Sequence, residues 1–144
     1  MFDNTSMNIS ASGLAANQLW LNVIANNIAN VNTTRTPQGG PYRAEIVNFA
    51  PVENDVSFQT ALGQAVQGIG GGVEVTSITQ DTSPFQLIYD PSNPDAVNGY
   101  VETSNVNLTT QMVDLIQATR AYQANATAFD AAKQMAVTAL GIGK

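Results

Sequence analysis

The chain has 144 residues, of which 44% are hydrophobic and 11% are charged, and its net charge is −6. The length suits one domain, or a small domain with extensions. Only five lysines and arginines are present, which argues against binding to nucleic acid or docking on anionic lipid. The chain has no cysteine, so it forms no disulfide and has no thiolate chemistry.

The polar residues are mainly amides and hydroxyls. Asparagine, glutamine, threonine and serine make up a third of the chain. Charged residues make up only 11% of it, whereas they usually form about a quarter of a soluble domain. Amides cost less to bury than ions. We therefore expect the surface to lie against other protein surfaces.

The N-terminal region is uncharged from Asn4 to Thr34. It contains no lysine or arginine before Arg35 and no compact apolar segment, which argues against a cleaved secretory signal. No apolar run reaches the roughly 18 residues of a membrane span. We expect no direct membrane insertion, and any export should leave the N-terminus intact.

A long helix is expected within residues 1–34. Apolar side chains recur every seven residues, the spacing that seats one helix against another; they are Met7, Leu14, Leu21 and Ile28. The stretch "ANNIANVNT" places asparagines on the opposite face, which we expect to remain uncovered and to meet neighbouring subunits. These asparagines include Asn26, Asn27 and Asn30. Asn30 or Asn32 can end the helix, because asparagine tolerates the left-handed conformation.

Residues 35–103 are expected to form a small β-rich domain. Strands are predicted over 42–49, 71–80 and 85–90, where β-forming side chains stand between polar residues and turn signals. The stretch "DPSNPDAVNGY" is expected to be a turn-rich loop. The segment at about 52–72 reads as a flexible insert, with a possible short helix in "FQTALGQAVQ".

A second long helix is expected within residues 104–144, from about Leu108 to Leu140, with Asn107 as its N-cap. Its side chains again repeat at seven-residue spacing: Leu108, Leu115, Tyr122, Phe129 and Ala136, widened by Met112. The simplest arrangement pairs the two terminal helices antiparallel, as a coiled-coil-like stalk with the β-rich middle at its far end. The predicted fold class is therefore α+β.

No catalytic or ligand-binding set is evident. Histidine is absent, so the chain lacks a side-chain base that titrates near neutrality and lacks histidine metal ligands. The "GIGGG" run matches no phosphate-binding motif, and a linker explains it. We expect no cofactor, no metal and no enzymatic activity.

Several stretches together resemble the flagellar basal-body rod proteins. They are "ANNIANVNT", "PYRAEIV" at 41–47, "YDPSNPDAVNGYV" at 89–101, "SNVNL" at 104–108 and "RAYQAN" at 120–125. The resemblance spans nearly the whole chain, and the short length favours a proximal-rod member. It implies export through the flagellar type III apparatus without a cleaved signal. It also implies assembly in the periplasm into a hollow helical rod, which transmits torque from the membrane ring to the hook.

The expected partners are other rod proteins and copies of the chain itself, together with the export apparatus. The assembly interface is predicted on both helices, at Leu14, Leu21, Asn26, Asn27, Ile28, Asn30, Leu108, Met112, Leu115, Tyr122, Asn125 and Phe129. A secreted or periplasmic binding module with a helical oligomerisation stalk remains the alternative.

Overall fold

The computed structural model describes residues 5–52 and 71–142. Two long helices come before and after two small antiparallel sheets in chain order, which confirms the predicted α+β class. The elements are α1 (Thr5–Ala29), β1 (Glu45–Pro51), β2 (Val73–Gln80), β3 (Gln86–Tyr89), β4 (Tyr100–Thr103) and α3 (Leu108–Ile142). The flexible insert predicted at about 52–72, with its short helix, lies almost entirely outside the described residues.

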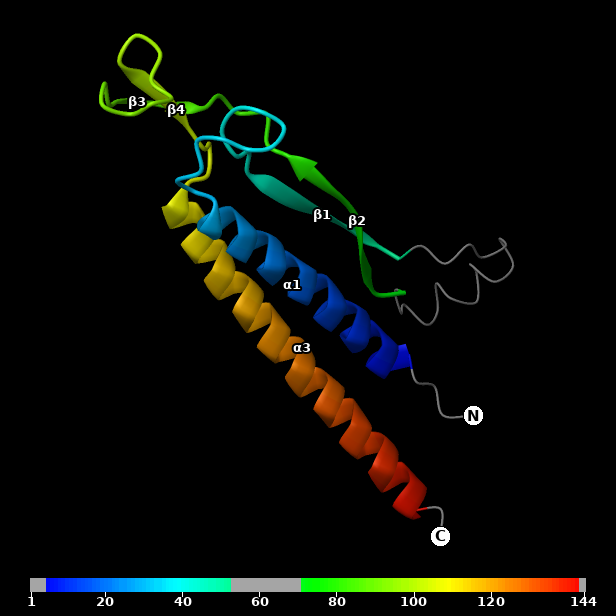
Figure 1. Cartoon of the computed structure of the whole chain (residues 1–144). Coiled ribbons are helices and arrows are strands. Elements are labelled where there is room, and N and C mark those ends of the chain that lie inside the picture. Colours follow the sequence, from blue (N-terminus) through cyan, green and yellow to red (C-terminus); the bar gives the residue numbers. More distant parts are fainter. Residues whose placement is uncertain (1–4, 53–70, 143–144) are drawn as a thin grey trace, which may run out of the picture.

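The helices α1 and α3 lie side by side and run in opposite directions (Figure 1). Asn27 Nδ2 donates a hydrogen bond to Gln111 Oε1 at 3.0 Å. A Cβ atom added to Gly13 would lie 2.8 Å from Asn125 Nδ2. On α1, Asn27 follows Gly13 by as many residues as Asn125 follows Gln111 on α3. The two contacts therefore occur in opposite order along the two helices, as an antiparallel pair requires. Because α3 has 35 residues and α1 has 25, the C-terminal end of α3 extends past the start of α1.

Small side chains occupy much of the contact between the two helices. Gly13 on α1 is buried, and Ala118 and Ala132 are the buried residues of α3. Small residues let two helix backbones approach closely. The larger buried side chains include Val23 and Ile24, in the second half of α1, and Val47 in β1.

The hairpin β1–β2 packs on α1. Its strands pair from Glu45↔Gln80 to Pro51↔Val73, with a bulge between Asn48 and Phe49. The Phe49 ring meets the Trp20 ring edge-on at a centroid distance of 5.7 Å. At the start of β2, the Val73 N–H donates to Ser12 Oγ at 3.2 Å. These contacts hold the hairpin along one flank of α1.

The hairpin β3–β4 stands at the end of the molecule opposite the start of α1 and the end of α3 (Figure 1). Its strands pair from Gln86↔Thr103 to Tyr89↔Tyr100. The Asn98-Gly99 turn has positive φ at both residues, 55° and 80°, as a type I′ hairpin turn requires. The sequence prediction placed this turn correctly but missed strand β4, because it assigned the residues up to Tyr100 to a loop.

One predicted strand boundary is wrong, and so is the predicted reason for the end of the first helix. The strand expected over 42–49 begins at Glu45, because Tyr42 instead donates its N–H to Thr33 O and its hydroxyl to Asn27. Helix α1 does end just before Asn30, but among the described non-glycine residues only Asn98 has positive φ. Asn30 instead turns its amide back onto Asn26 O, at 3.0 Å.

The predicted cap of α3 is confirmed. The Thr110 N–H donates to Asn107 Oδ1 at 3.1 Å, and the helix begins at Leu108. This bond satisfies one of the free amide groups in the first turn of the helix. The preceding residues also anchor the helix start, since Ala44 N donates to Asn105 Oδ1 at 2.8 Å.

Candidate assembly surface

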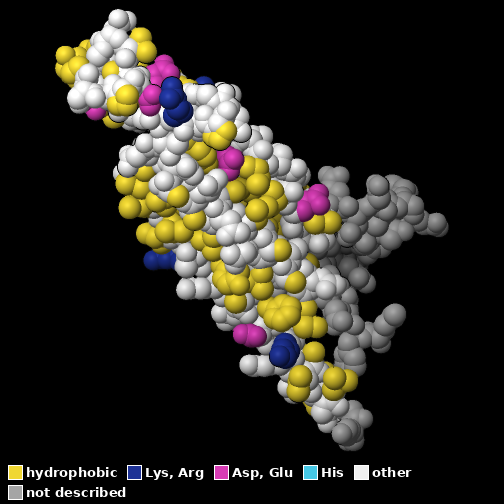
Figure 2. Space-filling view, viewed as in Figure 1, with side chains coloured by type: hydrophobic (Ala, Val, Ile, Leu, Met, Phe, Trp, Pro, Cys, Tyr) yellow, Lys and Arg dark blue, Asp and Glu magenta, His cyan; other side chains and the backbone are white. Residues whose placement is uncertain are grey.

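The outer face of α3 carries large apolar side chains that nothing in the described chain covers. Met112 is 51% exposed and Ile116 is 55% exposed. Figure 2 shows hydrophobic side chains along the visible face of the helix pair, with few charged side chains among them. The exposed set on α3 is Leu108, Met112, Val113, Leu115, Ile116, Met135, Val137, Leu140 and Ile142. They form two groups, at residues 108–116 and 135–142, and large exposed apolar patches commonly mark interaction sites.

The apolar heptad of α3 was predicted to face the partner helix, and this is wrong for its first members. Leu108 and Leu115 are exposed, whereas Tyr122 and Phe129 are half-buried. A strict seven-residue repeat drifts by about 20° per heptad around a straight α-helix. The stripe therefore starts away from α1 and rotates toward it along the helix.

The apolar stripes of the two helices lie on the same side of the pair. On α1, Leu14 follows the contact residue Gly13, and Ile28 follows Asn27. On α3, Met112 follows Gln111. Each residue along an α-helix turns the side chain by about 100°. Because the two helices run in opposite directions, side chains one residue after the contact residue on each helix point to the same side of the pair. Leu14, Leu21 and Ile28 are half-buried there, beside the exposed Leu108, Met112 and Leu115.

The asparagine face of α1 was expected to be uncovered, and for Asn27 this is wrong. Its side chain is 1% exposed and makes four hydrogen bonds within the chain. It donates to Glu45 O at 2.8 Å and to Gln111 Oε1 at 3.0 Å. Its Oδ1 accepts from Glu45 N at 2.9 Å and from the Tyr42 hydroxyl at 3.0 Å. The amide therefore joins α1 to β1 and to the start of α3.

The neighbouring asparagines remain accessible. Asn26 is exposed and donates to the Tyr42 hydroxyl at 3.2 Å and to Glu45 Oε2 at 3.4 Å. Asn30 is half-buried and bonds to Asn26. Burial and the nearby Glu45 carboxylate raise the pKa of Tyr42 to about 12. Tyr42 thus keeps its proton, and with it the bond to Asn27, throughout the physiological pH range.

The remaining predicted interface residues lie toward α1. Asn125 contacts the Gly13 position directly, and its side chain is half-buried. Tyr122 and Phe129 are half-buried on the same face of α3. These three side chains are thus partly used by contacts within the chain, and their remaining exposed surface adjoins the apolar stripe.

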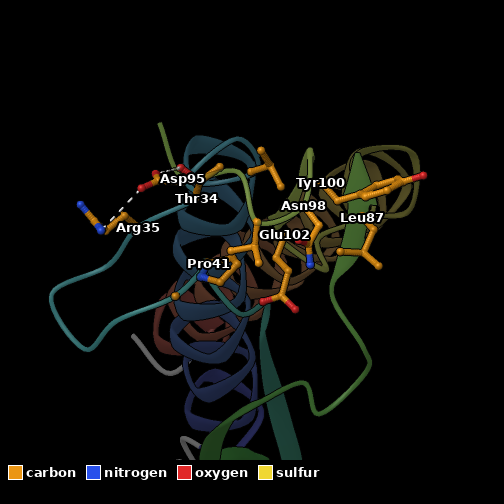
Figure 3. A pocket seen from close by; sticks show the side chains of 11 residues that line it. Thr34, Arg35, Pro41, Leu87, Asp95, Asn98, Tyr100 and Glu102 are labelled. Carbon is orange, nitrogen blue, oxygen red and sulfur yellow. Dashed lines mark hydrogen bonds and ion pairs between the residues drawn. The ribbon is translucent and has the colours of Figure 1, made fainter. Parts of the chain in front are cut away.

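Sequence reasoning missed a second apolar surface, on the β3–β4 hairpin. Leu87, Ile88, Tyr89, Val97 and Tyr100 are all exposed there, with Val97 at 72%. A cavity of about 580 Å³ lies between this hairpin and the loop that follows α1. Figure 3 shows Leu87, Tyr100 and Glu102 on one side of it and Thr34, Arg35 and Pro41 on the other. The alternating apolar residues of "FQLIY" and "NGYV" were the available signal.

Charge contributes little to these surfaces. In residues 5–52 and 71–142 one ion pair is formed, between Arg35 and Asp95 at 3.6 Å, and the Arg35 side chain is 79% exposed. The described residues contain no group of acidic side chains suited to a metal ion. Neither helix, in the part of the chain that the structure describes, is long and apolar enough to cross a membrane.

Two protein-family models match the chain. The model described as "Flagella basal body rod protein" matches residues 7–35, which contain most of α1. The model described as "Flagellar basal body rod FlgEFG protein C-terminal" matches residues 97–142, which contain β4 and α3. The matches therefore cover both helices of the pair and the end of the β3–β4 hairpin.

Curated relatives match over nearly the full chain. The flagellar basal-body rod protein FlgC of Borreliella burgdorferi is 47% identical over 96% of this chain and 95% of its own length. The FlgC proteins of Bacillus subtilis and Salmonella typhimurium are 43% and 39% identical. The Bacillus subtilis match covers 96% of this chain and 97% of the relative, and the Salmonella typhimurium match covers 94% of each.

Proposed function

This chain belongs to the FlgC-like flagellar basal-body rod proteins, and we propose that it builds the proximal rod by packing its terminal helices against those of neighbouring subunits. It is a structural subunit of the rod and not an enzyme, in line with the rod proteins that it matches. The alternative of a binding module with an oligomerisation stalk is not favoured, since the relatives named above are all rod proteins.

The observation that carries the proposal is the exposed apolar stripe of α3. Met112, Leu115 and Ile116 are exposed in a protein that has few charged residues to keep such a surface in water. Fully burying an aliphatic side chain of this size contributes roughly 1.5–3 kcal/mol, and Met112, Leu115 and Ile116 still have 51%, 36% and 55% of their surface to bury. Neighbouring helices that cover these side chains would supply the remaining part of that stabilisation in the assembled rod.

The helix pair is proposed to act as an antiparallel coiled-coil-like stalk. Residues 1–34 and 104–144 form the stalk, and residues 35–103 form the middle domain at its far end. The proposed contacts in the wall of the hollow rod are the stripe residues on the uncovered side of the helix pair. They are Leu14, Leu21, Ile28, Leu108, Met112 and Leu115. Asn26, Asn30, Tyr122, Asn125 and Phe129 border that surface, whereas Asn27 is assigned an internal role.

The partners are proposed to be other rod proteins and further copies of this chain. Membership of the family supports export through the flagellar type III apparatus and a position in the periplasmic part of the rod. In that position a hollow assembly of such subunits would transmit torque from the membrane ring to the hook. No cofactor, nucleic acid or membrane insertion enters this proposal.

The test places a charge on the stripe. Leu115→Asp and Leu21→Asp should each block rod assembly while export continues, because an unpaired charge would be buried in a subunit contact. Gln117→Asp is the matched control, since Gln117 is exposed on the other flank of α3 and gains the same charge. The measurements are motility, the amount of exported protein, and the amount of protein in isolated basal bodies.

The two outcomes differ clearly. Assembly blocked in the Leu115 and Leu21 variants but not in Gln117→Asp would support the stripe as a subunit contact. Normal swimming and normal incorporation of Leu115→Asp would remove the stripe from the mechanism. Loss of export in every variant would show instead that the substitutions act before assembly.

A further inference from the structure

The turn of the β3–β4 hairpin carries the one asparagine-glycine pair of the sequence, Asn98 and Gly99. Both residues have positive φ, 55° and 80°, a conformation that glycine adopts freely and asparagine tolerates. A Cβ atom added to Gly99 would lie 3.0 Å from Tyr89 Cε2, so the ring beside the turn leaves little room for a side chain there. The geometry of the hairpin therefore favours this pair at this place.

An asparagine that precedes glycine can modify itself. The peptide nitrogen of the glycine attacks the side-chain carbonyl carbon of the asparagine, and the new carbon–nitrogen bond closes a five-membered succinimide ring. The bond to the amide nitrogen breaks, and that nitrogen leaves as ammonia with the proton of the peptide N–H. Water then opens the ring at either carbonyl group, which gives aspartate or isoaspartate. The reaction consumes only water, and a side chain on the following residue hinders it.

The peptide nitrogen of Gly99 is available for this attack. Within the described part of the chain its N–H donates no hydrogen bond, whereas the N–H groups on either side of the turn are bonded. The Val97 N–H donates to Tyr100 O at 2.8 Å, and the Tyr100 N–H donates to Val97 O at 3.1 Å. Asn98 is exposed and Gly99 is half-buried, so water reaches the reacting groups.

From these observations we propose that Asn98 is a self-modification site. In the folded chain it loses ammonia to form a succinimide with the nitrogen of Gly99, and water converts the ring to aspartate or isoaspartate. The inference goes beyond the proposed function in the rod and does not depend on it.

The product changes the cavity at this end of the molecule. Asn98 lines the cavity together with Asp95 and Glu102 (Figure 3). Arg35 lines it as well, and its guanidinium already pairs with Asp95 at 3.6 Å. A carboxylate at position 98 therefore adds a negative charge that has no basic partner among the lining residues. Isoaspartate also adds one carbon to the backbone of a tight two-residue turn, which should weaken the pairing of the two strands.

The test follows the purified full-length chain during incubation at pH 8. Mass spectrometry of digested samples measures the converted fraction at each asparagine, and isoaspartyl methyltransferase with a labelled methyl donor measures the isoaspartate. Two asparagines of the same chain are the controls. Asn93 lies in the same loop but precedes Pro94, which has no peptide N–H. Asn107 is exposed but precedes Leu108, whose side chain hinders the attack.

We expect Asn98 to be converted at least about tenfold faster than Asn107, which requires a barrier only about 1.4 kcal/mol lower. Asn93 should not form a succinimide. Asn98→Gly should remove the isoaspartate signal and keep the turn, because glycine adopts positive φ. Equal rates at Asn98 and Asn107 would overturn the proposal. Conversion of Asn98 only in chain unfolded by guanidinium chloride would also overturn it, because the folded turn would then protect this residue.

Discussion

Asn27 and Glu45 exchange two hydrogen bonds, in which the side-chain amide of one helix residue pairs with the peptide group of a strand residue. Glu45 N donates to Asn27 Oδ1 at 2.9 Å, and Asn27 Nδ2 donates to Glu45 O at 2.8 Å. The side chain thus takes the place of a neighbouring strand at the first residue of β1. Two stretches that carry the family resemblance, "ANNIANVNT" and "PYRAEIV", meet at this pair.

Replacement of Asn27 by leucine should destabilise this end of the molecule. Glu45, Tyr42 and Gln111 would lose a partner, and a buried polar group left unpaired costs about 1–3 kcal/mol. We expect a loss of about 2 kcal/mol in the free energy of unfolding, measured by urea titration. The fluorescence of Trp20, the single tryptophan, reports the unfolding because that ring packs on Phe49 in the folded chain.

Asn22→Leu is the matched control for this variant. Asn22 is exposed on the same helix, and its hydrogen bond to Gln18 is long, at 3.5 Å. A surface substitution of this type usually changes stability by less than about 0.5 kcal/mol. Equal effects of Asn27→Leu and Asn22→Leu would refute the structural role assigned to Asn27.

Stability should fall at high pH because of Tyr42. Its pKa is raised from 10.0 to about 12 in the folded chain, so the unfolded chain loses this proton first. The contribution is complete below pH 10 and is lost as the pH rises toward 12. After allowance for partial exposure we expect it to reach about 1–2 kcal/mol.

Tyr42→Phe isolates that effect, because it removes the titrating hydroxyl and keeps the ring. The variant should be less stable than the parent at pH 8, since Asn27 Oδ1 loses one donor. The difference between the two proteins should shrink between pH 10 and 12 in urea titrations. A difference that stays constant over this range would rule out Tyr42 as the source.

Gly13 and Asn125 should be energetically coupled. Alanine favours a helix interior over glycine by about 1 kcal/mol, but a Cβ at Gly13 would lie 2.8 Å from Asn125 Nδ2. We therefore expect Gly13→Ala to stabilise the helix pair only when Asn125→Ala is also present. Thermal melting followed by circular dichroism, on the parent, both single variants and the double variant, measures the coupling; strictly additive effects would contradict close packing here.

The isolated subunit should contain less helix than α1 and α3 hold in the structure. A helix that buries little of its own surface gains little from tertiary packing, and among the described residues of α3 only Ala118 and Ala132 are buried. Circular dichroism should show helicity rising on co-assembly with other rod subunits. Hydrogen exchange should find protection near Ala118 and little near Leu140 before assembly. A fully protected α3 in the monomer would oppose this view.

The sequence by itself determined the element types and their order for most of the chain. Apolar side chains that recur every seven residues predicted two long helices. Asn107 was identified as the cap of the second helix because its amide suits that position. The Asn98-Gly99 pair predicted a turn for an equally local reason. Family resemblance was readable from the same stretches, and the relatives confirm it.

Only the tertiary structure decided which surface each stripe meets. A heptad pattern shows that a face is apolar, but it does not say whether the partner is the other helix of the same chain or a neighbour. The small residues Gly13 and Ala118 bring the helices together, so Leu115 remains exposed. The burial of Asn27 likewise depends on Glu45 and Gln111, which are distant in sequence, and no local pattern encodes their meeting.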